Sequence, residues 1–123
     1  MAEPGTRRFR GDEGEALVAR FLVEHGFRVL GRNVRLGALE IDIVAREGSV
    51  VALVEVRTRS PGSLTSGLSS VGPTKLLRLR RAGERLWNRE FRYDPTCTRL
   101  RFDLAAVTVT NERAEIEYVR AAF

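Results

Sequence analysis

The alternation of apolar and polar positions predicts a β-hairpin in the middle of the chain, within residues 37–59. Residues 39–44 alternate between apolar and mostly polar side chains, which is the period of a strand with one buried face. Residues 50–57 are apolar on both faces until the end of the run, and Glu47-Gly48 separates the two runs as a turn. We therefore expect two neighbouring strands, of which the second is buried on both sides.

Apolar residues at helical spacing predict two helices, at residues 13–25 and 73–89. Asp12 can serve as the N-cap of the first helix, and Gly26 can end it in a left-handed conformation. Pro73 suits the first turn of the second helix. Each helix has one apolar side, so we expect both to pack against a sheet.

The predicted elements follow the order helix, three strands, helix, strand and a short extra strand. Outside the hairpin, the pattern predicts a strand at 27–34 with a bend at Gly31, a loop at 60–72, a strand at 99–110, a turn at Asn111-Glu112 and an edge strand at 114–119. Three consecutive strands can form an antiparallel meander, and the second helix allows the fourth strand to join a mixed sheet. We therefore predict an α/β fold with a mixed central sheet flanked by helices.

Length and composition indicate one globular domain. The chain has 123 residues, of which 43% are hydrophobic and 30% charged, and this supports a single core at residues 11–123 after a flexible basic arm at residues 1–10. No apolar run approaches the roughly 20 residues of a membrane span, and the start lacks the apolar core of a signal peptide. One cysteine and one histidine exclude a disulfide framework and histidine-cluster or cysteine-rich metal sites. We expect a cytoplasmic protein.

The charge of the chain favours an anionic partner. The net charge is +5 and the sequence pI is about 10.6, which makes nucleic acid the first candidate and an acidic membrane surface the second. Basic residues recur at three- and four-residue steps on the second predicted helix. Together with Arg59 they are the nucleic-acid-binding candidates: Lys75, Arg78, Arg81 and Arg85. A solvated helix face is the alternative. We expect the partner to be DNA, with no membrane partner.

Two carboxylates lie inside the predicted hairpin, where a purely structural pair of strands would carry apolar residues. Asp42 and Glu55 belong to neighbouring strands and can therefore converge. A buried charge is costly unless it is paired or bound to a metal ion. Two carboxylates suit a hard divalent ion such as Mg²⁺ or Mn²⁺, which can activate water and neutralise charge on a phosphate. Glu15 keeps two interpretations, a capping-box partner of Asp12 and a carboxylate at the edge of an active site.

Short motifs distributed over residues 14–107 form a specific combination. They are Gly14-Glu15-Ala16 with Ala19 and Leu22, Gly26-Phe27, Asn33 with Arg35, Glu40-Ile41-Asp42-Ile43-Val44, Val54-Glu55-Val56-Arg57-Thr58-Arg59, Lys75 with Ala82, and Arg101-Phe102-Asp103. With these motifs the chain resembles the YraN-like family of small bacterial proteins, a branch of the PD-(D/E)XK nuclease superfamily. The resemblance implies an αβββαβ restriction-endonuclease-like core, as in Holliday-junction resolvases. It also implies that Asp42 and Glu55 hold Mg²⁺ and that Glu15 assists from the first helix.

One position departs from the pattern of that family, which has lysine two residues after the second acid. This chain has Arg57 there. A lysine would orient the attacking water and stabilise the developing phosphate charge, whereas an arginine binds through a planar fork and does not readily lose a proton. Lys75 is the only lysine among 21 basic residues. One hypothesis is that Lys75 points toward Asp42 and Glu55 and takes over this role; the alternative is a lysine on the basic helix face.

Three functions stay open at the level of the sequence. The first is a metal-dependent endonuclease that hydrolyses phosphodiester bonds in DNA, with these catalytic candidates: Glu15, Asp42, Glu55, Arg57 and Lys75. The second is a nucleic-acid-binding module on a nuclease fold, with weak or absent catalysis. The third is a protein-interaction domain whose basic face meets an acidic partner, since a fold does not by itself settle function. Both a monomer and a homodimer stay open.

Overall fold

The computed structural model describes residues 13–59, 72–110 and 113–123. Several sequence-based expectations fall outside these residues: the arm at 1–10, the Asp12 cap, the loop at 60–71 and the turn at Asn111-Glu112. The elements in chain order are α2 (Gly14–Glu24), β1 (Arg28–Leu36), β2 (Leu39–Glu47), β3 (Val50–Arg59), α3 (Pro73–Leu86), η3 (Trp87–Phe91), β4 (Arg99–Val109) and β5 (Ala114–Val119).

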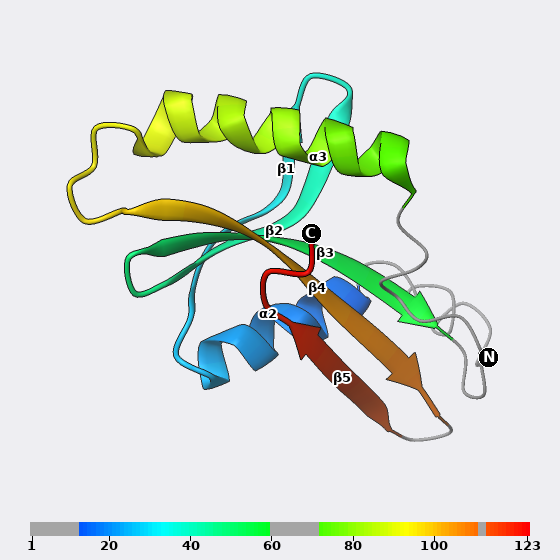
Figure 1. Ribbon diagram of the computed structural model, residues 1–123. Helices are drawn as coiled ribbons and strands as arrows, with labels where there is room; N and C mark the ends of the chain where they lie inside the picture. Colours follow the sequence, from blue (N-terminus) through cyan, green and yellow to red (C-terminus); the bar gives the residue numbers. More distant parts are fainter. Residues whose placement is uncertain (1–12, 60–71, 111–112) are drawn as a thin grey trace.

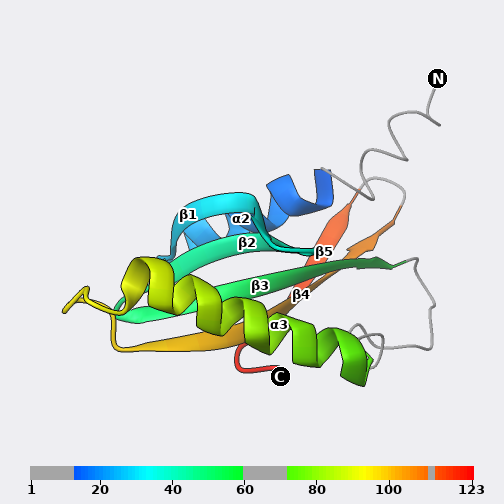
Figure 2. The ribbon, with the colours of Figure 1, turned by 90° about the horizontal axis from the view of Figure 1, so that it is seen from above.

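The five strands form one mixed sheet with a helix on each face. Figure 1 shows α2 and α3 on opposite sides of the sheet, and Figure 2 shows the same three layers from above. The strand order is β1-β2-β3-β4-β5, with β3 and β4 parallel and the other neighbours antiparallel. A parallel pair needs a crossover, and α3 lies in the connection from β3 to β4. The mixed α/β fold predicted from the sequence is confirmed.

Turn glycines set the limits of the first three strands. Gly48 has φ +60° in the β2–β3 turn and Gly37 has φ +65° in the β1–β2 turn, conformations that favour glycine. Strand β1 therefore extends to Leu36 and pairs with β2 as far as Leu39, two residues further than the sequence pattern predicted. The pairing register of β1 shifts just before Gly31, where the sequence predicted a bend.

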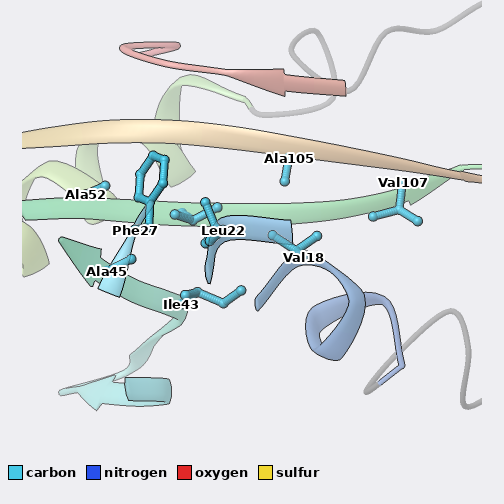
Figure 3. Close-up of a cluster of buried hydrophobic side chains, with 9 residues drawn as sticks. Val18, Leu22, Phe27, Ile43, Ala45, Ala52, Ala105 and Val107 are labelled. Atoms are coloured by element: carbon cyan, nitrogen blue, oxygen red, sulfur yellow. The ribbon is translucent and has the colours of Figure 1, made fainter. Parts of the chain in front are cut away.

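Each face of the sheet carries its own apolar cluster. The cluster on the α2 side is shown in Figure 3 and contains Val18, Leu22, Phe27, Ile43, Ala45, Ala52, Val54, Ala105 and Val107. The cluster on the α3 side contains Leu36, Ile41, Val44, Val51, Leu53, Ala82, Leu86, Phe91 and Cys97. Alternate residues of β3 therefore contribute to opposite clusters, and the strand is buried on both faces as its sequence predicted.

The second helix changes its winding near its C-terminal end. The sequence predicted one helix over 73–89, whereas α3 ends at Leu86 and the π-helix η3 follows. The N–H of Arg92 donates to the carbonyl of Trp87 at 2.8 Å, a five-residue step. In an α-helix, residues five apart differ in direction by about 140°. With the wider winding, Phe91 and Leu86 both lie in the α3-side cluster. Within the described residues, no helix has both the length and the apolar character needed to cross a bilayer.

A buried polar network joins β4 to β5 and the C-terminal residues. Asp103 is fully buried and accepts hydrogen bonds from Arg101 at 2.8 and 2.9 Å and from the Tyr118 hydroxyl at 2.6 Å. The backbone N–H of Ala121 donates to the same carboxylate at 2.9 Å, and Arg101 also bonds Glu47 at 2.8 Å. Burial, with the bond to Asp103, raises the pKa of Tyr118, so its hydroxyl remains a donor. The network accounts for this buried acid structurally.

Candidate functional site

The hairpin strands β2 and β3 part at Asp42 and Glu55. Their pairing runs from Glu47↔Val50 to Ile43↔Val54, so Asp42 and Glu55 are the next two facing positions beyond its end. The backbone N–H of Val56 donates to Oδ2 of the Asp42 side chain at 2.8 Å. The Asp42 carboxylate thus lies at the point where the two strands separate.

The side-chain alternation of β2 is interrupted at the same place. Ile41 packs in the cluster on the α3 side, whereas Ile43 packs in the cluster on the α2 side. Residues two apart in a regular strand point to the same face. The intervening Asp42 is therefore at an irregularity of the strand, which the period of the sequence did not predict.

Glu55 is a buried carboxylate between two cations from different elements. Its side chain is 5% exposed, and Oε2 accepts a hydrogen bond from Nζ of Lys75 at 2.7 Å. Nη2 of Arg57 lies 3.1 Å from the same oxygen. Glu55 and Arg57 are two residues apart on β3, and Lys75 is in the first turn of α3. The ion pairs compensate the cost of burying this charge.

Burial and neighbouring charges together raise the pKa of Asp42. Burial raises the pKa of Asp42 from its ordinary value of 3.8 to about 6, against the lowering effect of the Val56 N–H. The charges of Glu55 and Glu15 raise it further, and the charge of Lys75 lowers it. Glu55 from β3, Glu15 from α2 and Lys75 from α3 are therefore all within electrostatic reach of Asp42.

The Glu15 side chain contacts two residues of β1. The N-cap residue of α2 is Glu13, and no side chain caps the helix there. The Glu15 side chain is 14% exposed, and Nη2 of Arg32 lies 3.7 Å from Oε1. With its amide nitrogen turned to the carboxylate, Asn33 donates to Oε1 at 3.0 Å and to Oε2 at 3.2 Å. The capping interpretation of Glu15 involves Asp12, which lies outside the described residues, and its role near the site stays a prediction.

Asp42 and Glu55 offer two carboxylate groups to a metal ion. Among the described residues, no group of three or more His, Cys, Asp or Glu side chains is arranged to hold one ion. The described residues contact one oxygen of each carboxylate, Oδ2 of Asp42 and Oε2 of Glu55, through hydrogen bonds and ion pairs. One oxygen of each acid thus remains for a cation. Two carboxylates fit Mg²⁺ or Mn²⁺, which keep several waters.

The predicted nucleic-acid contacts divide into two groups. Arg78, Arg81 and Arg85 are exposed on α3, and the Arg85 guanidinium lies over Gly37 in the β1–β2 turn. Arg59 instead turns across the sheet, where it bonds Thr108 at 3.0 Å and Glu117 at 3.3 Å. Residues 73–91 contain six basic and two acidic side chains, whereas α2 contains one basic and two acidic ones. The α3 face is therefore the basic face of the described structure.

The sequence pattern placed Asn33 only in a motif, and it offered Arg32 either as a contact to a backbone phosphate or as a surface residue of the strand. The available signal for Asn33 was its residue type, since asparagine inside a strand pattern often marks a left-handed backbone. Arg57 carries a further signal that only the structure reveals: its Nε is buried without a hydrogen-bond partner among the described residues. Such an unsatisfied donor is costly unless a ligand pairs with it.

Comparisons with known proteins find related sequences along most of the chain. The "Uncharacterised protein family UPF0102" matches residues 14–107, a range that contains every residue of the candidate site. A UPF0102 protein of Sorangium cellulosum is 45% identical over 118 residues, which cover 95% of this chain and 82% of the relative. UPF0102 proteins of Anaeromyxobacter dehalogenans and Moorella thermoacetica are each 39% identical, over 95% and 96% of this chain and 85% and 98% of their own lengths.

Proposed function

This chain belongs to the UPF0102 family, and we propose that it is a nucleic-acid-binding protein that hydrolyses phosphodiester bonds of DNA with Mg²⁺ or Mn²⁺. The observation that carries the proposal is the meeting of Asp42, Glu55 and Lys75, which come from three elements, at the point where β2 and β3 separate. Acids and a lysine gathered beside a basic face suit a phosphate substrate.

The order of elements supports this reading. One helix, three antiparallel strands, a second helix and a parallel fourth strand follow the αβββαβ order that the resemblance to PD-(D/E)XK nucleases implies. The two acids occupy the second and third strands, as that resemblance also implies. We therefore propose a restriction-endonuclease-like arrangement in which the site lies where these two strands diverge.

Each residue of the site has a distinct role in the proposal. Asp42 and Glu55 would hold the divalent ion, which when bound supplies an activated water and neutralises phosphate charge. Lys75 would donate to the attacking water or to a phosphate oxygen from its position 2.7 Å from Glu55. Arg57, whose side chain is 32% exposed, would stabilise developing negative charge on the substrate through its guanidinium group. Glu15 would add negative charge at the rim of the site.

A second function, nucleic-acid binding with weak or absent catalysis, has one observation in its favour. Lys75 and Arg57 both contact Oε2 of Glu55, so this carboxylate is already neutralised without a metal ion. A cation entering the site would have to share or displace these contacts. In this alternative the acids and bases stabilise one another, and the basic α3 face alone engages the phosphates.

The test is cleavage of labelled single-stranded DNA and four-way-junction DNA in Mn²⁺. The chain is compared with Asp42→Asn and with Glu115→Gln, a control that removes one exposed charge from β5. We expect cleavage by wild type and control, and background cleavage by Asp42→Asn, which still binds DNA. Equal cleavage by Asp42→Asn contradicts the site. Binding without cleavage in all three proteins supports the alternative, and absence of binding overturns both functions.

A further inference from the structure

Asn33 has an unusual backbone conformation for a residue inside a strand. Among the described residues, only two non-glycine positions have positive φ: Asn33 in β1 and Ala121 near the C-terminus, both at 53°. The left-handed region is sterically unfavourable for residues with a Cβ, although asparagine tolerates it better than most. Conformations of this kind persist where the surrounding contacts require them, and they concentrate at functional sites.

The contact that accompanies this conformation is the carboxylate of Glu15. The amide nitrogen of Asn33 lies 3.0 and 3.2 Å from the two oxygens of Glu15, in the orientation that allows donation. Arg32, the preceding residue of β1, lies 3.7 Å from Oε1. Glu15 is mostly buried, and a buried carboxylate needs donors to remain ionised. β1 thus supplies both a neutral and a charged partner to an acid on α2.

Glu15 in turn acts on the proposed metal site. Asn33, which donates to Glu15, occupies the β1 position opposite Asp42, between the paired positions Arg32↔Ile43 and Val34↔Ile41. The Glu15 carboxylate is thus held next to the strand position of Asp42. An added negative charge near a site for a hard divalent cation increases the affinity for that cation. Residues behind the ligands commonly tune metal affinity in this way.

We propose that Asn33 is a positioning residue, whose left-handed backbone places its amide on Glu15 and so fixes this carboxylate beside Asp42. The inference rests on the proposed function, because it assigns Asn33 an effect on divalent-cation affinity. The competing explanation is local: asparagine occupies position 33 only because it tolerates the backbone, and the contact with Glu15 follows passively.

Glycine at position 33 separates the two explanations. Asn33→Gly accepts a positive φ more readily than asparagine and removes the amide. If tolerance of the backbone were the whole role of Asn33, this variant would behave as wild type. Ala121→Gly is the matched control, because it makes the same backbone change at the other left-handed position, away from the site. Melting temperatures of both variants establish that they fold.

The experiment is a titration with Mn²⁺ alone, without nucleic acid, on wild type, Asn33→Gly, Glu15→Gln, the double variant and Ala121→Gly. We expect Asn33→Gly to bind Mn²⁺ about tenfold more weakly and Ala121→Gly to bind as wild type. Because Asn33 acts through Glu15, the double variant should be no weaker than Glu15→Gln. Wild-type affinity in Asn33→Gly, or additive losses in the double variant, overturns the inference alone. A wild type that binds no Mn²⁺ overturns the proposed metal site as well.

Discussion

The only lysine of the chain lies against Glu55, the most buried glutamate of the described residues. Nζ of Lys75 is 2.7 Å from Oε2 of Glu55, and its charge also acts on Asp42. The contact with Glu55 agrees with one of the two hypotheses that the sequence left open for Lys75, and the role of Lys75 stays a prediction. An ammonium group is a compact charge on a flexible stem, whereas a guanidinium is planar and keeps its proton. Exchanging Lys75 for arginine therefore shows whether the site requires the amine itself or only a positive charge.

We predict that Lys75→Arg impairs metal-dependent DNA cleavage by about 10- to 100-fold while DNA binding is retained. The positive charge survives in this variant, but the longer planar group cannot reproduce the single contact on Glu55. Rates under single-turnover conditions and affinities from fluorescence anisotropy separate the two effects. Arg78→Lys is the control for an exchange of the same two residue types on the exposed part of α3. Unchanged cleavage by Lys75→Arg would refute a specific role for the amine.

The periodicity of apolar residues predicted the helices and strands, because these elements depend on the burial of one or both faces. The hairpin, both helices and the last two strands follow from apolar spacing, because each element packs one or both faces on a core. The same reasoning predicted that Asp42 and Glu55 lie on neighbouring strands. The periodicity did not predict the irregularity of β2 at Asp42. This change in side-chain direction depends on where β2 and β3 separate, which the spacing of apolar residues does not indicate.

Two further features depend on tertiary contacts and were not predictable. The π-helical winding of η3 places Phe91 in the same buried cluster as Leu86, a packing that requires the sheet to be present. The left-handed backbone of Asn33 is paired with a carboxylate from another element, Glu15. Local propensity carries little information about contacts between residues far apart in the chain.

Helix α3 is the element on which the binding prediction rests. Replacing Arg78, Arg81 and Arg85 with alanine removes three exposed cations from one face. We expect weaker DNA binding and a decrease of about 2 to 3 in the slope of log affinity against log salt concentration, since each phosphate contact contributes about 0.9. Anisotropy titrations at several salt concentrations measure this slope.

The control for that prediction removes the same net charge from other surfaces. Arg20, Arg28 and Arg99 are exposed on α2, β1 and β4, and their triple alanine variant has the same formal charge as the α3 variant. If both triple variants lose the same slope, DNA responds to net charge and the α3 face has no special role. A loss confined to the α3 variant supports a defined path for the backbone of the nucleic acid.

At the scale of the whole molecule, the candidate site exists only where all three layers meet. Glu15 comes from α2 on one face, Asp42 and Glu55 come from the sheet, and Lys75 comes from α3 on the opposite face (Figure 2). Among the described residues, α2 contributes side chains to one buried cluster and α3 to the other, and the sheet lies between the two helices. The site is thus a product of the complete fold and not of one motif.

We propose that Asp42 and Glu55 form a site for a divalent cation. The binding of Mn²⁺, followed by electron paramagnetic resonance of the free ion, tests this site most directly. Wild type, Asp42→Asn and Glu115→Gln are titrated without nucleic acid. We predict one site in wild type and in the Glu115→Gln control, and an affinity weaker by more than about tenfold in Asp42→Asn. Equal binding of Mn²⁺ by Asp42→Asn and wild type would contradict the account.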